Sequence, residues 1–303
     1  MAWFTFSFPD FAVAFLSVLL EGVPFILLGT ILSGLIDEFL PSKVMVRFLP
    51  KNAFLGVCVS GAMGLIFPMC ECGIVPVIRR LMRKGLPISN AIAYMLAAPI
   101  VNPIVALSTF AAFSGQNAVE MTTLRLGVGY LVAILAAFAV HNLPVRSVLR
   151  DSVLTDQSGD HEHSHGGKFL QRIGNALKVT VNDFLDVMIY FILGVAISSL
   201  FSTGINREIF VPLATNVWLA VGSFMGLAVI LSLCSTSDAF VAASFKMFPF
   251  VAKLAFLVLG PMFDLKMLFM YSAVFKKRFV VGLAVGLFVL IGLICVRLTV
   301  LKL

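Results

Sequence analysis

The chain of 303 residues is 60% hydrophobic and only 12% charged, and its mean hydropathy is +1.05. These values exclude a soluble protein and indicate a multi-pass membrane protein. Lys and Arg give a formal net charge of +7, but in membrane proteins they collect in cytoplasmic loops. We therefore attribute the positive net charge to loops on the cytoplasmic side of the membrane and expect no nucleic-acid partner. The five cysteines fall in or beside apolar segments, which indicates free thiols rather than a secreted disulfide framework.

Apolar segments follow one another along the chain with short polar connections. The first begins near an N-terminus that has no basic stretch and no small-residue cleavage site, so we expect it to be retained as a membrane span. Residues 142–168 are rich in Ser, Asp, Gly and His without apolar periodicity, and they separate two sets of four segments. The segments are residues 11–36, 53–82, 86–113, 124–141, 183–205, 213–245, 250–275 and 279–300.

The two sets of segments are similar to each other. Residues 21–29 align without gaps with residues 186–194, which keeps an acid and a Leu-Gly pair in both. Internal repeats of this kind are typical of secondary transporters, and chance similarity between apolar segments is the alternative. The aligned polar positions are Glu21 with Asp186, Cys70 with Cys234, and Asn102 with Asp264.

The predicted fold is therefore an all-α polytopic membrane protein with two homologous repeats. The first repeat spans residues 1–141 and the second spans residues 183–303. Residues 142–182 form a cytoplasmic linker, which contains His residues and an amphipathic segment.

Loop charges distinguish two topologies for these repeats. If every segment crosses the membrane, the basic loops fall on both sides. If residues 53–82 and 213–245 are re-entrant hairpins, the basic loops gather on one side and the repeats are inverted. The charge distribution favours the second arrangement, with broken or re-entrant helices.

The run from Pro68 to Gly73, Pro-Met-Cys-Glu-Cys-Gly, places two thiols and a carboxylate at a break in apolar sequence. Polar groups at membrane depth are expensive and usually functional. Pro68 and Gly73 favour a non-helical backbone, in which the alternate spacing lets the sulfurs of Cys70 and Cys72 face one ion. A helix over residues 74–82 would follow.

Thiolates select soft acceptors such as Cu(I), Zn(II) or trivalent arsenic, and Cys234 supplies a third sulfur if the tips of the two hairpins meet. We expect Cys70, Glu71 and Cys72 to bind substrate together with Cys234. The alternative is that these cysteines are buried and pack as small hydrophobic residues.

Prolines interrupt one segment of each repeat. Asn102 lies between two prolines, and Asp264 follows a third. Such breaks free carbonyl groups that bind a cation or a polar substrate, and a purely structural kink is the alternative. We expect Asn102, Asp238 and Asp264 to line the substrate site, with Lys266 as a candidate to neutralise Asp264.

Two further acids, Glu21 and Asp186, occupy matched positions in apolar sequence. Proton-coupled transport needs carboxylates of this kind, so we predict that they couple transport to protons, with paired structural ions as the alternative. The linker carries His161, His163 and His165 at alternate positions, which suits transient binding of Zn, Cu or Ni. A solvated loop with incidental histidines is the alternative there.

Two motifs resemble the YraQ-like predicted permeases, a group that also contains the ArsP-type organoarsenical exporters. They are Met-Cys-Glu-Cys-Gly-Ile-Val-Pro-Val-Ile-Arg-Arg at residues 69–80 and Met-Leu-Ala-Ala-Pro-Ile-Val-Asn-Pro-Ile-Val-Ala at residues 95–106. The resemblance covers nearly the whole chain. It implies a multi-pass permease of the bacterial cytoplasmic (inner) membrane, with trivalent organoarsenical efflux known for some members. It also implies that Cys70 and Cys72 are the positions that bind substrate. The Glu71 between them is typical of the broader permease branch. Some relatives look zinc-regulated and are accompanied by a second small membrane subunit.

The sequence thus predicts a secondary transporter in the lipid bilayer that moves a thiophilic metal or metalloid species outward, without a cofactor. No Walker A sequence is present, so ATP would have to come from a partner. A membrane thiol oxidoreductase that cycles Cys70 and Cys72 is one alternative, although one intervening residue would make a strained disulfide ring. A non-transporting regulatory subunit of a zinc-linked permease complex is the other.

Overall fold

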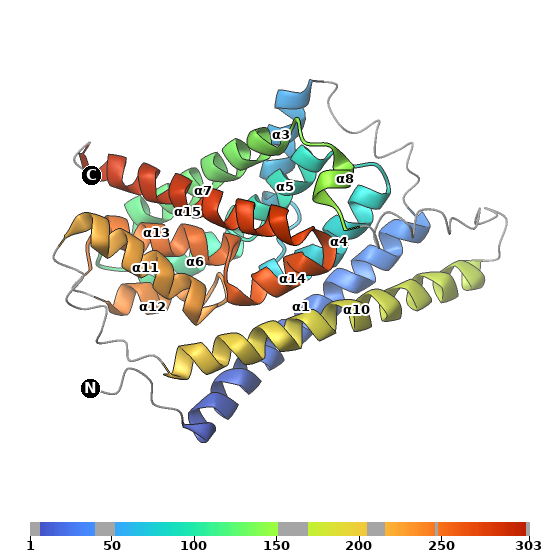
Figure 1. Ribbon diagram of the computed structural model, residues 1–303, viewed down its shortest axis with the longest axis horizontal. Coiled ribbons are helices and arrows are strands. Elements are labelled where there is room, and N and C mark those ends of the chain that lie inside the picture. The colour runs from blue at the N-terminus through green and yellow to red at the C-terminus, as the bar shows by residue number, and fades with distance from the viewer. Residues whose placement is uncertain (1–6, 40–51, 151–168, 205–215, 246–247, 301–303) are drawn as a thin grey trace.

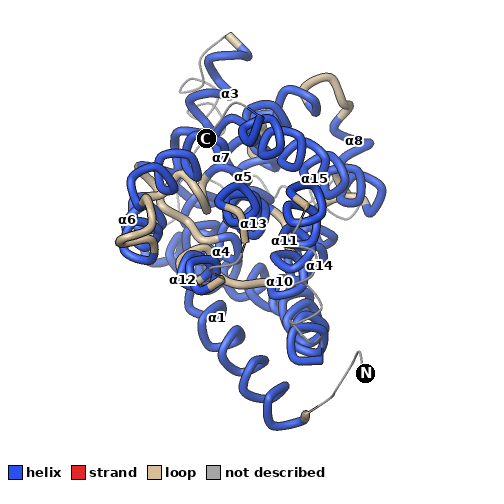
Figure 2. The backbone as a smooth tube through the Cα atoms, turned by 90° about the vertical axis from the view of Figure 1, so that its left-hand side faces the viewer, coloured by secondary structure: helices blue, strands red, loops and turns tan. Residues whose placement is uncertain are grey.

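The computed structural model describes residues 7–39, 52–150, 169–204, 216–245 and 248–300. Its regular elements are helices, apart from an isolated β-bridge between Leu149 and Phe275 (Figures 1 and 2). Within the described residues, 5 helical stretches are long and apolar enough to cross a membrane. An all-α multi-pass membrane protein is therefore confirmed.

The helices of the first half are α1 (Phe8–Phe39), α3 (Ala53–Ala62), the 3₁₀ helix η1 (Met63–Leu65), α4 (Glu71–Arg83), α5 (Ile88–Ala97), α6 (Pro103–Ala112), α7 (Ala118–Val140) and α8 (Val145–Val148). Those of the second half are α10 (Phe169–Gly204), α11 (Val217–Leu231), α12 (Asp238–Ser244), α13 (Phe250–Met262), α14 (Leu265–Val274) and α15 (Lys277–Val300).

Four of the predicted apolar segments are broken into two helices, as the proline and cysteine positions predict. The breaks lie between η1 and α4, α5 and α6, α11 and α12, and α13 and α14. We call residues 66–70 the first tip and residues 232–237 the second tip. Two boundaries differ from those that the sequence predicts. Residues 169–182, which we assigned to the linker, form the first part of α10, and α7 begins at Ala118 instead of Leu124.

The long helices α1 and α10 lie side by side along one edge of the molecule (Figure 1). They run antiparallel, since Gly22 of α1 faces Phe191 of α10 whereas Gly34 faces Thr180. The Ser33 hydroxyl donates a hydrogen bond of 2.7 Å to the Asp183 carboxylate across this interface. Small residues let the two backbones approach closely, which is how helices associate within a membrane.

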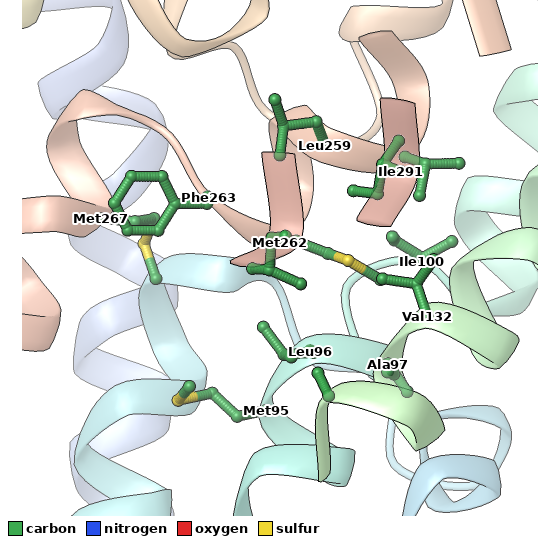
Figure 3. Packing of buried hydrophobic residues seen from close by; sticks show 14 of the residues in the cluster. Met95, Leu96, Ala97, Ile100, Val132, Leu259, Met262, Phe263, Met267 and Ile291 are labelled. Atoms are coloured by element: carbon green, nitrogen blue, oxygen red, sulfur yellow. The ribbon is translucent and has the colours of Figure 1, made fainter. Parts of the chain in front are cut away.

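The centre of the molecule is formed by α5 and α13, both of which are buried along their length. They pack between α3, α7, α11 and α15. Figure 3 shows Met262 of α13 beside Ile100, Val132 of α7 and Ile291 of α15. This apolar centre holds the four helix breaks in fixed relative positions.

Close backbone contacts join the long helices to the broken ones. Gly29 of α1 lies against the Gly73 backbone of α4, and Gly194 of α10 lies against the Lys266 backbone of α14. A methyl group on Gly194 would come within 2.9 Å of the Lys266 Cα, so a side chain there requires one of the backbones to move. Glycine is needed at both positions because of these contacts rather than because of its conformational freedom.

We expect Gly29→Ala and Gly194→Ala each to lower the free energy of unfolding by about 1–3 kcal/mol, the usual cost of overpacking. Gly127→Ala on α7 is the matched control, since nothing lies within 4 Å of the added methyl group. Because Ala is the better helix former, the control should be neutral or stabilising. Unfolding of the detergent-purified variants measures this, and equal effects at the three positions would contradict the close contacts.

Candidate functional site

Three of the four breaks are stabilised by a polar residue that caps the helix after the break. The Cys70 sulfur accepts from the Gly73 N–H at 3.3 Å, Asn102 Oδ1 accepts from the Ile104 N–H at 2.9 Å, and Asp264 Oδ1 accepts from the Met267 N–H at 2.7 Å. Each side chain satisfies an N–H that the helix itself leaves without a partner. The residues that the sequence singles out at the breaks therefore begin α4, α6 and α14.

The local structure predicted around Cys72 is wrong. We expected a non-helical backbone through Gly73, but α4 begins at Glu71 because Cys70 acts as its N-cap. Gly73 lies within the first turn, where it lets α4 approach the Phe25 backbone of α1. The two sulfurs therefore lie on a capping residue and a helical residue, and do not share an extended strand.

A cavity of about 140 Å³ lies where the two tips meet. The second tip contributes Cys234 and the next two residues, and the first tip contributes Cys70, whereas Cys72 is buried and does not line the cavity. Asn102 lines it from the α5–α6 break. The lining residues are Phe25, Leu28, Pro68, Met69, Cys70, Gly73, Asn102, Ile104, Val105, Cys234, Ser235 and Thr236, none of which carries a formal charge.

Beside this cavity, Lys266 of α14 connects three elements. Its ammonium lies 3.2 Å from Glu71 Oε1 of α4 and 3.1 Å from Asp264 Oδ2, so the expected pairing of Lys266 with Asp264 is confirmed. It also donates to the carbonyl oxygens of Ser232 and Leu233 in the second tip, at 3.0 and 3.2 Å. All three charged side chains are buried, at 2% exposure or less.

A second buried cation, Arg125 of α7, binds the other end of the second tip. It pairs with Asp238 at 2.7 Å and donates to the Ser235 carbonyl at 2.9 Å and to the Thr109 hydroxyl of α6 at 2.7 Å. Asp238, which we expected to bind substrate, is thus held in a buried ion pair. Lys266 and Arg125 together attach the second tip to α4, α6, α7 and α14.

The two acids predicted to couple transport, Glu21 and Asp186, have different surroundings. Asp186 is exposed on α10 and pairs with Arg79 of α4 at 3.2 Å. Its neighbour Asp183 is buried and pairs with Arg80 at 3.0 Å. Glu21 is exposed on α1, one helical turn before Phe25, and residues four apart share a helix face, so Glu21 lies on the side of α1 that borders the cavity.

The three linker histidines, His161, His163 and His165, fall outside the described residues. Within the described ranges, no three His, Cys, Asp or Glu side chains lie close enough together to hold a metal ion. The structure therefore brings Cys70 and Cys234 to one cavity without assembling the three-sulfur site that the sequence suggested.

Arg125 is the residue at this site that the sequence analysis missed. Its sequence signal is present, because a lone Arg in an apolar span is rare and usually functional. We placed the start of that span at Leu124 and assigned no role to Arg125. The structure begins α7 at Ala118 and buries Arg125 completely.

A family model described as a predicted permease, ArsP_1, matches residues 8–300. The chain belongs to this family. The resemblance proposed from the two motifs is thereby confirmed, and the protein is a predicted membrane permease whose multi-pass architecture agrees with its helices. No solved structure matches the chain.

Two similar bacterial proteins align with most of the chain, and a third aligns with a shorter part of it. The "UPF0718 protein YcgR" of Bacillus subtilis (strain 168) is 38% identical over 277 residues, which are 90% of this chain and 92% of the relative. A Streptococcus mutans protein named "putative two-component membrane permease complex subunit" is 36% identical over 267 residues, 88% of this chain and 87% of the relative. The "UPF0718 protein YraQ" of Escherichia coli (strain K12) is 30% identical over 76 residues, 25% of this chain and 22% of the relative.

We expect Arg125→Met to lower the free energy of unfolding by about 3–5 kcal/mol, because it leaves the Asp238 carboxylate buried without its cation. The double variant Arg125→Met/Asp238→Leu should recover most of this loss, since it removes both charges. Asp186→Asn, at an ion pair whose acid is 61% exposed, is the control and should cost about 1 kcal/mol or less. Denaturant unfolding checks these values; a double variant that loses the sum of its two single losses would contradict a buried pair.

Proposed function

We propose that this permease is a secondary transporter that exports a small, uncharged thiophilic species, such as a trivalent metalloid compound, with Cys70 and Cys234 as its sulfur ligands. The observation that carries the proposal is the cavity between the tips, because one thiol from each half of the chain lines it. Sulfur ligands select soft acceptors. The outward direction follows from the resemblance to the organoarsenical exporters.

The lining of the cavity supports an uncharged substrate. Apolar side chains dominate it, and its polar groups are thiols, hydroxyls and the Asn102 amide. An isolated ion in such surroundings would lack the charge partner that burial requires. The nearby carboxylates of Glu71 and Asp264 both contact the Lys266 ammonium and lie outside the cavity lining, so they hold the tips in place without meeting the substrate.

The order of helices supports the proposed duplication of the chain. In each half a long helix is followed by two broken segments and a second long helix, and Cys70 and Cys234 lie at corresponding breaks. Helices α3 and α11 have 10 and 15 residues, and at 1.5 Å per residue both are too short to cross about 30 Å of hydrocarbon. These lengths favour re-entrant hairpins and inverted repeats, an architecture that places the substrate at the breaks.

For coupling we propose Glu21 as the carboxylate that links transport to protons, because it lies one turn from the cavity lining on α1. Asp186 is its counterpart by sequence alignment. Asp186 pairs with Arg79 of α4, which favours the alternative for Asp186, a structural ion pair that holds α4 against α10.

The first test measures accumulation of methylarsenite, zinc and copper in everted membrane vesicles from a host that lacks its own arsenic transporters. We expect uptake of the arsenical by the wild type and a loss of at least about 10-fold in Cys70→Ser and in Cys234→Ser, as for weakened metal ligation. Cys295→Ser is the matched control, because this buried cysteine of α15 does not line the cavity. Wild-type uptake by the double variant Cys70→Ser/Cys234→Ser would refute the ligand role.

The same vesicles test the coupling residues. Glu21→Gln should abolish the response of uptake to an imposed pH gradient while leaving downhill exchange of substrate intact. Asp186→Asn should retain both if its role is structural. A Glu21→Gln variant that still responds to the gradient would exclude Glu21 as the coupling group.

A second candidate function is that of one subunit in a two-component permease. The name of the Streptococcus mutans relative favours it, since that relative aligns over most of both chains. In this case the second component would be a small membrane protein, and His161, His163 and His165 would sense metal on the cytoplasmic face. The substrate is then bound as above, but transport requires the partner.

Reconstitution of the purified chain alone into liposomes distinguishes the two candidates. A self-sufficient transporter moves the arsenical without any other protein, whereas a subunit is inactive until its partner is added. Deletion of residues 160–167 should change the response to added zinc and leave basal transport unchanged. Loss of basal transport on deletion would count against a purely sensory linker.

A further inference from the structure

The surroundings of the Lys266 ammonium resemble the coordination shell of a metal cation. Four oxygen atoms, from Glu71, Asp264, Ser232 and Leu233, lie between 3.0 and 3.2 Å from its Nζ atom. An ammonium has three protons to donate, so the number of close oxygens exceeds the number of directional hydrogen bonds it can make. Two carboxylates and two backbone carbonyls are also the ligand types that hard cations prefer.

The two carbonyls are available because α11 ends just before them. Its last residue is Leu231, and Ser232 adopts a left-handed conformation with φ of 46°, which turns the chain away from the helix axis. Carbonyl groups at a helix C-terminus have no partner within the helix and form the negative end of its dipole. A left-handed conformation is uncommon for a residue other than glycine, so the surrounding contacts hold Ser232 in place against a conformational cost.

The charges at this position do not balance. Glu71 and Asp264 supply two carboxylates, and Lys266 supplies one ammonium. The second oxygen of Glu71 is buried and has no hydrogen-bond partner among the described residues, although burial of an unpaired acceptor is costly. Oxygen ligands and negative charge therefore remain in excess even with the lysine in place.

We propose that Glu71, Asp264 and the carbonyls of Ser232 and Leu233 form a monovalent-cation site, and that the Lys266 ammonium occupies it as a cation tethered to the protein. Unwound carbonyls and the C-terminal ends of half-helices bind the coupling cation in transporters with broken helices. Here the chain supplies the cation itself. The wild-type protein therefore binds neither sodium nor potassium at this position, and removing the ammonium opens the site to a free cation.

If the chain is the secondary transporter proposed above, its coupling ion binds somewhere other than the break between α11 and α12, because the Lys266 ammonium already occupies that position. The cation site itself does not rest on that function. It requires only that the four oxygens keep their positions when the ammonium is removed.

Thermal unfolding of the detergent-purified chain tests the site through two variants that remove the same charge. Lys266→Ala leaves space at the four oxygens, whereas Lys266→Met fills that space with a side chain of similar length. We expect the unfolding midpoint of Lys266→Ala to rise by about 3 °C or more when choline chloride is replaced by ammonium or potassium chloride at equal concentration. The midpoints of the wild type and Lys266→Met should not respond, and sodium chloride shows whether a smaller ion also fits.

Two outcomes would overturn the proposal. One is a Lys266→Ala midpoint that is the same in every salt; the other is an equal response of Lys266→Met, which would indicate a general salt effect. Adding Glu71→Gln to Lys266→Ala should abolish the ion response, because it removes one charged ligand.

If Lys266→Ala cannot be isolated in any salt, its membrane yield is compared with that of Glu71→Gln/Lys266→Ala. We expect the double variant to accumulate to a higher level, because it relieves the repulsion between two unpaired carboxylates. An equal or lower yield would overturn the proposal. None of these measurements needs a substrate, so their failure leaves the roles of Cys70 and Cys234 untouched, and failure of the cysteine variants in vesicles leaves the cation site untouched.

Discussion

The structure depends on two buried cations that bind one short loop. Lys266 attaches the start of the second tip to α4 and α14, and Arg125 attaches its end to α6 and α7. Each cation is paired with at least one buried carboxylate, as charges inside a membrane must be. An irregular backbone at membrane depth is tolerated only where protein groups satisfy its hydrogen bonds, and here the two cations do so.

The second tip also connects the charges to the cavity. The carbonyls of Ser232 and Leu233 face Lys266, while the next residue along the chain, Cys234, lines the cavity. The cavity lining and the contacts of Lys266 therefore lie on consecutive residues of one loop.

The breaks before α6 and α14 were predictable from the sequence because both follow from local chemistry. Pro103 suits the first position of a helix, and Asn102 and Asp264 are good caps, so the starts of α6 and α14 can be read directly from the chain. The start of α4 was not predictable in the same way. A cysteine is not a usual N-cap, and Gly73 suggested a turn when its role is to let α1 approach, a requirement that depends on a distant helix. The burial of Arg125 was missed for a related reason, since its charge partner, Asp238, lies more than 100 residues further along the chain.

The two tips are stabilised by different chemistry, although they occupy corresponding places in the chain. The first tip is held by neutral groups: the Cys70 sulfur caps α4, and the Tyr94 hydroxyl donates to the Phe67 carbonyl at 3.2 Å. The second is held by two cations, the Lys266 ammonium and the Arg125 guanidinium. A hydrogen bond between neutral groups contributes about 0.5–1.5 kcal/mol, whereas breaking a buried ion pair costs about 3–5 kcal/mol. The contacts that hold the second tip therefore contribute more to stability than those that hold the first, although both tips line the same cavity.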